Sequence, residues 1–164
     1  MDAPTFRRIM GQFATGVTIL AARAGNVIHG MTANAFTSVS LHPPLVLVCV
    51  ANASRTKQVL DRAGWFAVSI LAGDQGEVAR IFSNPDLDGT QRFARVRWRA
   101  GQSGAPIIED CLAYLESRVV ATYEAGDHTV YLGEVERGEV VRPEGAPLVF
   151  FRGDYGILNG RGEA

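Results

Sequence analysis

Cysteine is scarce in this chain of 164 residues, and its two cysteines, Cys49 and Cys111, stand far apart inside apolar runs. Neither belongs to a CxxC pair or a Cys/His cluster, so the sequence predicts neither a zinc site nor a disulfide framework. Histidines and carboxylates are not spaced as metal ligands either. We therefore expect no metal site and a reducing, cytoplasmic setting.

Long hydrophobic runs and a strong charge of one sign are also lacking. The longest apolar run, 45–51, is far shorter than the roughly 20 residues of a membrane helix, and no basic segment followed by an apolar one opens the chain. The formal net charge of -1 argues against nucleic acid or an anionic membrane as the main partner. We expect a soluble, unexported protein that binds neither.

Several familiar signatures are absent from the sequence. There is no GxGxxG motif after a predicted strand, no GxSxG elbow and no P-loop. A Rossmann unit, an α/β-hydrolase site and a P-loop nucleotide site are thereby excluded.

The composition is that of an ordinary globular domain, with 47% hydrophobic and 20% charged residues. A length of 164 residues fits a single domain, 1–164, that buries roughly two thirds of its unfolded surface. β-branched and aromatic segments between Gly and Pro predict a mainly β (α+β) chain. The most economical arrangement is a closed or half-closed antiparallel barrel with a few short helices.

The order of helices and strands follows from the hydrophobic periodicity and from the Gly and Pro residues between the periodic segments. Phe6, Ile9, Met10 and Phe13 have helical spacing behind Asp2, which predicts an amphipathic helix that ends near Gly16 and packs on a sheet. Ser54 caps a second helix that ends before Gly64. We further expect a hairpin from 17–22 and 27–31, strands at 45–51 (buried on both sides), 65–71, 111–123, 129–141 and 148–152, a short helix at 74–82, and a mobile loop at 83–89.

The segment 31–57 is the most informative part of the chain. It begins with short polar side chains, which leave room for a flat ligand to approach the backbone, and the alternative is an edge strand whose polar residues face solvent. Ser54, Arg55 and Thr56 then stand at a helix start, just after Asn52. Free N–H groups, hydroxyls and a guanidinium suit a phosphate, although an ordinary helix cap has similar residues.

Together with GDHT at 126–129 and RGDYG at 152–156, this segment resembles the flavin reductase family over residues 6 to about 158. The resemblance implies a homodimeric, flavin-binding split barrel. It also implies that the chain reduces FMN or FAD with NADH or NADPH and hands the reduced flavin to a separate monooxygenase. The redox chemistry would then come from the bound flavin.

The resemblance also implies roles for individual residues. His128 would meet the nicotinamide, with Asp127 holding its imidazole; without the resemblance, a histidine in such a turn is more often a surface residue than a functional group. Tyr155 would lie near the flavin or the dimer seam, or is simply a core aromatic residue. The other implied flavin-binding positions are Thr32, Ala33, Asn34, Ser38, Val39 and Ser40 at the ring, Asn52, Ser54, Arg55 and Thr56 at the phosphate, and Phe82 as cover.

Two further interpretations remain open at this level. The basic run Arg92, Arg95, Arg97 and Arg99 is typical of a solvated face, and a role in holding a dinucleotide pyrophosphate is the alternative. The rival functions are a flavoenzyme resembling the pyridoxamine-phosphate oxidases and a non-catalytic flavin-binding module.

Overall fold

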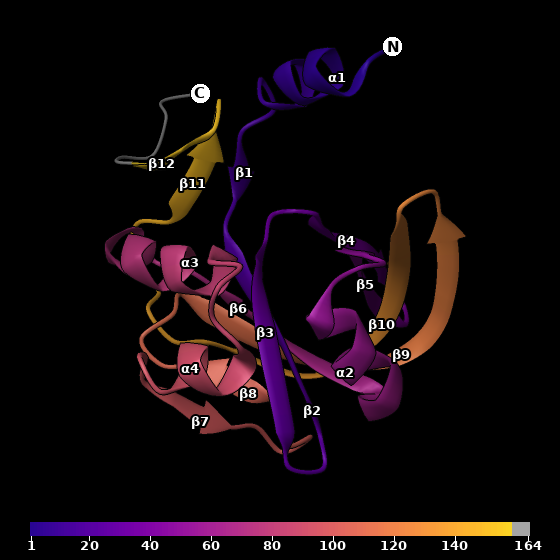
Figure 1. The fold of residues 1–164 in the computed structure, drawn as a ribbon. Helices are drawn as coiled ribbons and strands as arrows, with labels where there is room; N and C mark the ends of the chain where they lie inside the picture. Colours follow the sequence, from indigo (N-terminus) through magenta and orange to yellow (C-terminus); the bar gives the residue numbers. More distant parts are fainter. Residues whose placement is uncertain (159–164) are drawn as a thin grey trace.

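The computed structural model describes residues 1–158 and confirms a mainly β chain with a few short helices (Figure 1). The helices are α1 (Ala3–Met10), α2 (Arg55–Ala63), η1 (Gly73–Gln75), α3 (Gly76–Ser83) and α4 (Gly89–Phe93). The strands are β1 (Thr15–Gly16), β2 (Thr18–Ala24), β3 (Val27–Ala33), β4 (Phe36–Leu41), β5 (Pro44–Ala51), β6 (Trp65–Ile70), β7 (Trp98–Ala100), β8 (Pro106–Ile108), β9 (Ala113–Ala125), β10 (His128–Val140), β11 (Leu148–Phe151) and β12 (Asp154–Ile157).

Seven strands form one antiparallel sheet in the order β3-β2-β6-β9-β10-β5-β4. Its two edge strands, β3 and β4, are consecutive in the chain and are joined by Asn34 and Ala35. Within residues 1–158 no ladder pairs β3 with β4, so closure of the barrel stays a prediction. A smaller sheet, β1-β11-β12, lies at the same end of the molecule as α1 (Figure 1).

Strand β2 faces two cores, because successive side chains of a strand point to opposite sides. Leu20 and Ala22 enter one core with residues of α2 and β5, while Ile19 and Ala21 enter the other with residues of α3 and α4. These four side chains are 1% exposed or less. The two cores therefore share strand β2. Of the helices next to β3, α2 packs into the first core, and α3 and α4 pack into the second.

Helix α1 is the main departure from the expected fold. Asp2 is its N-cap, since the Asp2 carboxylate accepts a hydrogen bond from the Thr5 N–H at 2.8 Å. The helix ends at Met10, however, and none of its residues is buried, so the prediction that it packs on a sheet is wrong. Its apolar side chains stay 49–55% exposed: Phe6, Ile9 and Met10.

Two other expectations need correction. Strand β5 is not buried on both sides: Val46, Val48 and Val50 are buried while the residues between them are only half-buried, so alternate side chains point to one buried and one partly open face. The segment predicted as a loop at 83–89 leads into the short helix α4, which the sequence pattern did not predict and which the Asp88 carboxylate caps. No helix in the described part is long and apolar enough to cross a membrane.

Candidate functional site

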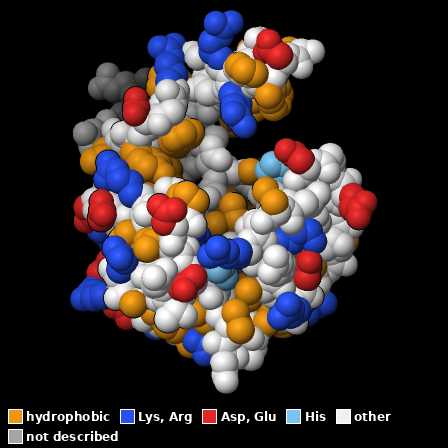
Figure 2. Space-filling view, viewed as in Figure 1, with side chains coloured by type: hydrophobic (Ala, Val, Ile, Leu, Met, Phe, Trp, Pro, Cys, Tyr) orange, Lys and Arg blue, Asp and Glu red, His pale blue; other side chains and the backbone are white. Residues whose placement is uncertain are grey.

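A pocket of about 400 Å³ lies over β3, between the beginning of α2 and the segment that runs from the end of α3 to α4. Five residues predicted from the sequence line it together: Thr32, Ser54, Arg55, Thr56 and Phe82. His29 and Arg92 also line it. In the view of Figure 2, histidine and Lys/Arg side chains lie side by side near the centre of the face, below a notch next to the end that carries α1.

The beginning of α2 points its N-terminal turn at this pocket. Ser54 is the N-cap, and its hydroxyl accepts a hydrogen bond from the Thr56 N–H at 3.1 Å. The backbone dipoles of a helix leave partial positive charge at this end, which favours an anion. Lys57 does not add to that charge, because its ammonium is held by Asp61 at 2.8 Å, one turn further along the helix.

His29 is a buried histidine that the sequence analysis did not single out. Its Nδ1 lies 2.9 Å from Thr56 Oγ1, its side chain is 7% exposed, and its Nε2 has no partner in the described chain. Burial, together with the positive charges of Arg92 and Arg55, lowers the pKa of His29 to about 4. The imidazole is thus neutral at pH 7 and joins β3 to α2.

Arg92 corrects the interpretation of the basic run as a solvated face. It is 7% exposed, and its guanidinium donates from Nη1 to Gly30 O and from Nη2 to Asn84 O, both at 2.6 Å. Its Nε is buried without a partner in the described chain. Arg95, Arg97 and Arg99 are exposed as expected. The unforeseen helix α4 is what turns Arg92 inward.

The predicted ring segment divides into two parts. Thr32 and Ala33 end β3: the Thr32 hydroxyl donates to Ala79 O at 2.6 Å, and Ala33 is buried. Asn34 is exposed at the corner that follows. Thr32 and Asn34 line a smaller pocket of about 170 Å³ together with Tyr155, so these three predicted residues do meet. Ser83 lines both pockets and places them next to one another.

Ser38, Val39 and Ser40 lie apart from this pair of pockets. They belong to the edge strand β4 and line neither pocket; Ser38 and Val39 are exposed, and Ser40 is half-buried. A contact between β4 and a flavin ring therefore remains a prediction from the family resemblance.

Asn52 and His128 belong to one connected unit. The Asn52 side chain accepts from Thr129 Oγ1 at 2.7 Å and donates to Gly126 O at 3.3 Å, which ties the turn before α2 to the tip of the β9–β10 hairpin. His128 begins β10, opposite Ala51, and its side chain is 45% exposed. Asn52 thus has its amide engaged by the hairpin rather than aimed at the pocket over β3.

Asp127 holds the imidazole of His128, as the sequence predicted. The Asp127 carboxylate lies 2.8 Å from His128 Nδ1, and this hydrogen bond lowers the pKa of Asp127. The exposed part of the imidazole faces solvent and is free to contact a ligand.

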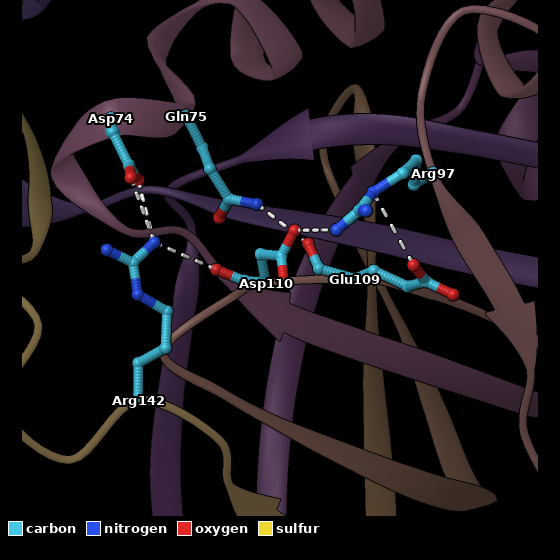
Figure 3. Close-up of polar contacts among 6 residues, drawn as sticks. All are labelled: Asp74, Gln75, Arg97, Glu109, Asp110 and Arg142. Carbon is cyan, nitrogen blue, oxygen red and sulfur yellow. Dashed lines mark hydrogen bonds and ion pairs between the residues drawn. The ribbon is translucent and has the colours of Figure 1, made fainter.

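A polar network away from the pocket fixes the start of the η1–α3 segment, which ends in Phe82 and Ser83 (Figure 3). Arg142 Nη1 donates to Asp74 at 2.9 Å and to Asp110 O at 3.2 Å, and Gln75 Nε2 donates to Glu109 O at 2.9 Å. The Arg142 guanidinium lowers the pKa of Asp74.

A sequence model described as the flavin reductase like domain matches residues 10–159, which is most of the chain. The chain belongs to this family. The reductase subunit HsaB of a flavin-dependent monooxygenase from Mycobacterium tuberculosis is 39% identical over 156 residues, covering 94% of this chain and 82% of the relative. An NADH-dependent FAD reductase from Streptomyces globisporus is 46% identical over 136 residues, covering 82% of this chain and 74% of the relative.

Solved structures of other flavin reductases superimpose closely on this one. The NADH:FAD oxidoreductase SgcE6 of Streptomyces globisporus, determined in complex with NAD and FAD fragments, has a TM-score of 0.92 and 40% identity, with 99% of this chain and 96% of that chain covered. BorF, the flavin reductase component of a bacterial two-component tryptophan halogenase, has a TM-score of 0.90 and 38% identity, with 98% and 100% covered.

The chemistry of the pocket over β3 suits an anion such as a phosphate. Two buried nitrogens, His29 Nε2 and Arg92 Nε, lack partners in the described chain, and a helix N-terminus with Ser54 and Arg55 faces the same space. Such unpaired polar groups are costly unless an anion or water meets them. Among residues 1–158, no group of three or more His, Cys, Asp or Glu side chains is placed to hold a metal ion.

Proposed function

We propose that this chain is an NAD(P)H:flavin oxidoreductase that transfers hydride from NADH or NADPH to FMN or FAD. Family membership and relatives named as NADH-dependent flavin reductases support this activity. The observation that carries the proposal is the basic pocket over β3, where Ser54 and Arg55 lie next to Thr32. It provides an anion site beside the smaller pocket of Asn34 and Tyr155.

In this proposal each part of the site has one task. Ser54, Arg55 and the N–H groups of α2 hold the flavin phosphate, and the residues from Thr32 to Ser40, with Tyr155, surround the ring. When bound, the flavin supplies the ring that accepts hydride from the nicotinamide C4. His128, oriented by Asp127, positions the nicotinamide amide, because hydride transfer requires close face-to-face stacking of the two rings.

The test is an absorbance assay at 340 nm in which FMN, FAD and riboflavin are each crossed with NADH and NADPH. We expect nucleotide oxidation that depends on added flavin and continues over many turnovers. An enzyme like the pyridoxamine-phosphate oxidases would retain its flavin and not depend on added flavin. A non-catalytic flavin-binding module would bind flavin and leave NADH unchanged, which would refute the proposal.

We also propose that the chain is a single domain that acts as a cytoplasmic homodimer and supplies reduced flavin to a separate monooxygenase. HsaB is named as the reductase subunit of a flavin-dependent monooxygenase, which supports the oxygenase partner, and BorF is named as the flavin reductase component of a two-component tryptophan halogenase. The exposed apolar face of α1, with Phe6, Ile9 and Met10, supports a second copy as its cover. Light scattering that showed a fully active monomer at micromolar concentration would refute the dimer.

A further inference from the structure

A third cavity, of about 650 Å³, lies where α1 meets the turn between β11 and β12, and we call it the α1 cavity. Arginines and apolar side chains line it together: Arg7, Arg8, Arg152, Met10, Phe13 and Phe150. None of the three arginines forms an ion pair with a carboxylate of residues 1–158. Figure 2 shows Lys/Arg side chains gathered at the end of the molecule that carries α1. Unpaired positive charge next to apolar walls suits an anionic ligand that also has a ring.

Arg152 occupies a backbone position that arginine does not favour. The turn between β11 and β12 has two central residues with positive φ, 53° at Arg152 and 93° at Gly153. Such a hairpin turn favours Asn or Asp followed by Gly, because the left-handed region is unfavourable for longer side chains. Backbone strain of this kind is found at positions where the side chain has a function. The conformation of Arg152 therefore indicates a function for its guanidinium.

The Arg152 side chain is also held in place by the end of α1. Its Nε donates to Gln12 Oε1 at 2.9 Å, and its backbone N–H donates to Gly11 O at 3.0 Å. Its guanidinium carbon lies 4.8 Å from the centre of the Phe151 ring. Arg7 and Arg8 stand in the last turn of α1, where positive charge also suits the helix dipole. Arg152 has no such reason for its charge, so it carries the argument for a ligand.

The α1 cavity adjoins the proposed ring site and lies near His128. Asn34 lines both this cavity and the smaller pocket that contains Tyr155. The pKa of Asp127 is lowered by its hydrogen bond with His128 and, to a smaller extent, by the charge of Arg7, so α1 is close to this turn. A nicotinamide between His128 and the ring site would therefore have its ribose phosphate close to the arginines.

We propose that the α1 cavity binds the phosphate groups of the nicotinamide nucleotide, with Arg152 as the main contact and Arg7 and Arg8 as additional positive charges. The inference rests on the proposed hydride transfer from NADH or NADPH. The α1 cavity and the pocket over β3 share no lining residue, so hydride donor and flavin have separate phosphate sites. Phe6 and Ile9 do not line the α1 cavity and stay available to a second copy.

The experiment compares NADH with reduced nicotinamide riboside, a hydride donor without phosphate, in the absorbance assay with FMN as the flavin. The variants are Arg152→Asn and Arg7→Gln. Arg137→Gln is the control, because Arg137 is an exposed arginine of β10 without an ion pair to residues 1–158. We expect the KM for NADH to rise about tenfold in Arg152→Asn and about threefold in Arg7→Gln, with kcat unchanged. The kcat/KM for the riboside should change less than about twofold, and the control should match wild-type protein with both donors.

Arg152→Asn separates binding from folding, because asparagine tolerates a positive φ better than arginine does. We expect its unfolding temperature to be equal to or above that of wild-type protein. A merely structural Arg152 would instead give equal losses with both donors, which would overturn the proposal. A wild-type KM for NADH in Arg152→Asn would overturn it as well. Arg7→Gln, on the exposed surface of α1, provides the independent variant if Arg152→Asn does not fold.

Two further measurements test other occupants of the cavity. A fall in FAD affinity in fluorescence titration, with a wild-type KM for NADH, would assign the cavity to the flavin and overturn the proposal. A change of mass in light scattering relative to wild-type protein would mean that the arginines hold a second copy, which would also overturn it. Failure of the proposed function looks different, since wild-type protein would then oxidise neither donor.

Discussion

The imidazole of His29 and the hydroxyl of Thr56 are joined across the boundary between β3 and α2, with 2.9 Å between Nδ1 and Oγ1. The two residues lie 27 positions apart in the sequence. Thr56 is fully buried, and it is also the residue whose N–H is capped by Ser54. The contact therefore fixes the first turn of α2 against the floor of the pocket.

This contact makes stability depend on pH. The pKa of His29 falls from 6.5 to about 4 on folding, through burial and the charges of Arg92 and Arg55. Between pH 6.5 and 4 the unfolded chain binds a proton at His29 that the folded chain does not bind. The contribution of neutral His29 to the free energy of unfolding is therefore complete above pH 6.5 and is lost as the pH falls from 6.5 to 4. We expect about 1–2 kcal/mol of loss from pH 7.5 to 5 in urea unfolding. His29→Gln should show a smaller loss, and equal losses would contradict the assignment.

Arg55 should recognise the flavin phosphate and not the ring. We expect Arg55→Ala to weaken FMN binding by about 1.5–3 kcal/mol, roughly 10- to 150-fold, because a charge-assisted hydrogen bond is lost. Riboflavin has no phosphate and should bind unchanged. Arg62→Ala, at the other end of the same helix, is the matched control. Equal losses for FMN and riboflavin in a titration would mean that Arg55 is only a residue of the cap.

His128 should act on the nicotinamide alone. His128→Ala is expected to lower kcat/KM for NADH by up to tenfold, the equivalent of one hydrogen bond of about 0.5–1.5 kcal/mol, with flavin affinity unchanged. His128→Asn should recover more activity than His128→Phe, because an amide replaces the hydrogen bond and a phenyl ring does not. Steady-state kinetics checks this, and wild-type values for His128→Ala would place the nicotinamide elsewhere.

Asn52 should stabilise the fold and should not bind the phosphate. Its amide bonds to Thr129 and to Gly126 O, so Asn52→Ala removes two hydrogen bonds between the α2 turn and the hairpin. We expect the free energy of unfolding to fall by about 1–2 kcal/mol, measured by urea denaturation. The FMN-to-riboflavin affinity ratio should stay unchanged. A ratio that fell as it does for Arg55→Ala would restore Asn52 to the phosphate site.

The parts of the site that the sequence predicted are those set by local chemistry. Ser54 at a helix start and Gly64 at its end follow capping rules that involve a few neighbouring residues. Thr32 and Asn34 were found through a motif. These features can be identified from short stretches of sequence.

The parts that were missed depend on distant segments. Arg92 reaches Gly30 over a separation of 62 residues, and only the unforeseen helix α4 brings it there. His29 is an isolated histidine in an apolar strand, and its pairing with Thr56 requires α2 to lie on β3. For helix α1, the amphipathic spacing predicted a helix correctly but could not predict what packs against its apolar face.

Strand β2, whose alternate side chains enter two cores, has a consequence for cooperativity. Opening the first core exposes Leu20 and Ala22, and opening the second exposes Ile19 and Ala21. The backbone of β2 must move in either case. The two cores cannot melt separately, so calorimetry should record one transition. A ligand bound over the neighbouring β3, between α2 and α4, would contact helices of both cores. It would therefore raise the temperature of that single transition.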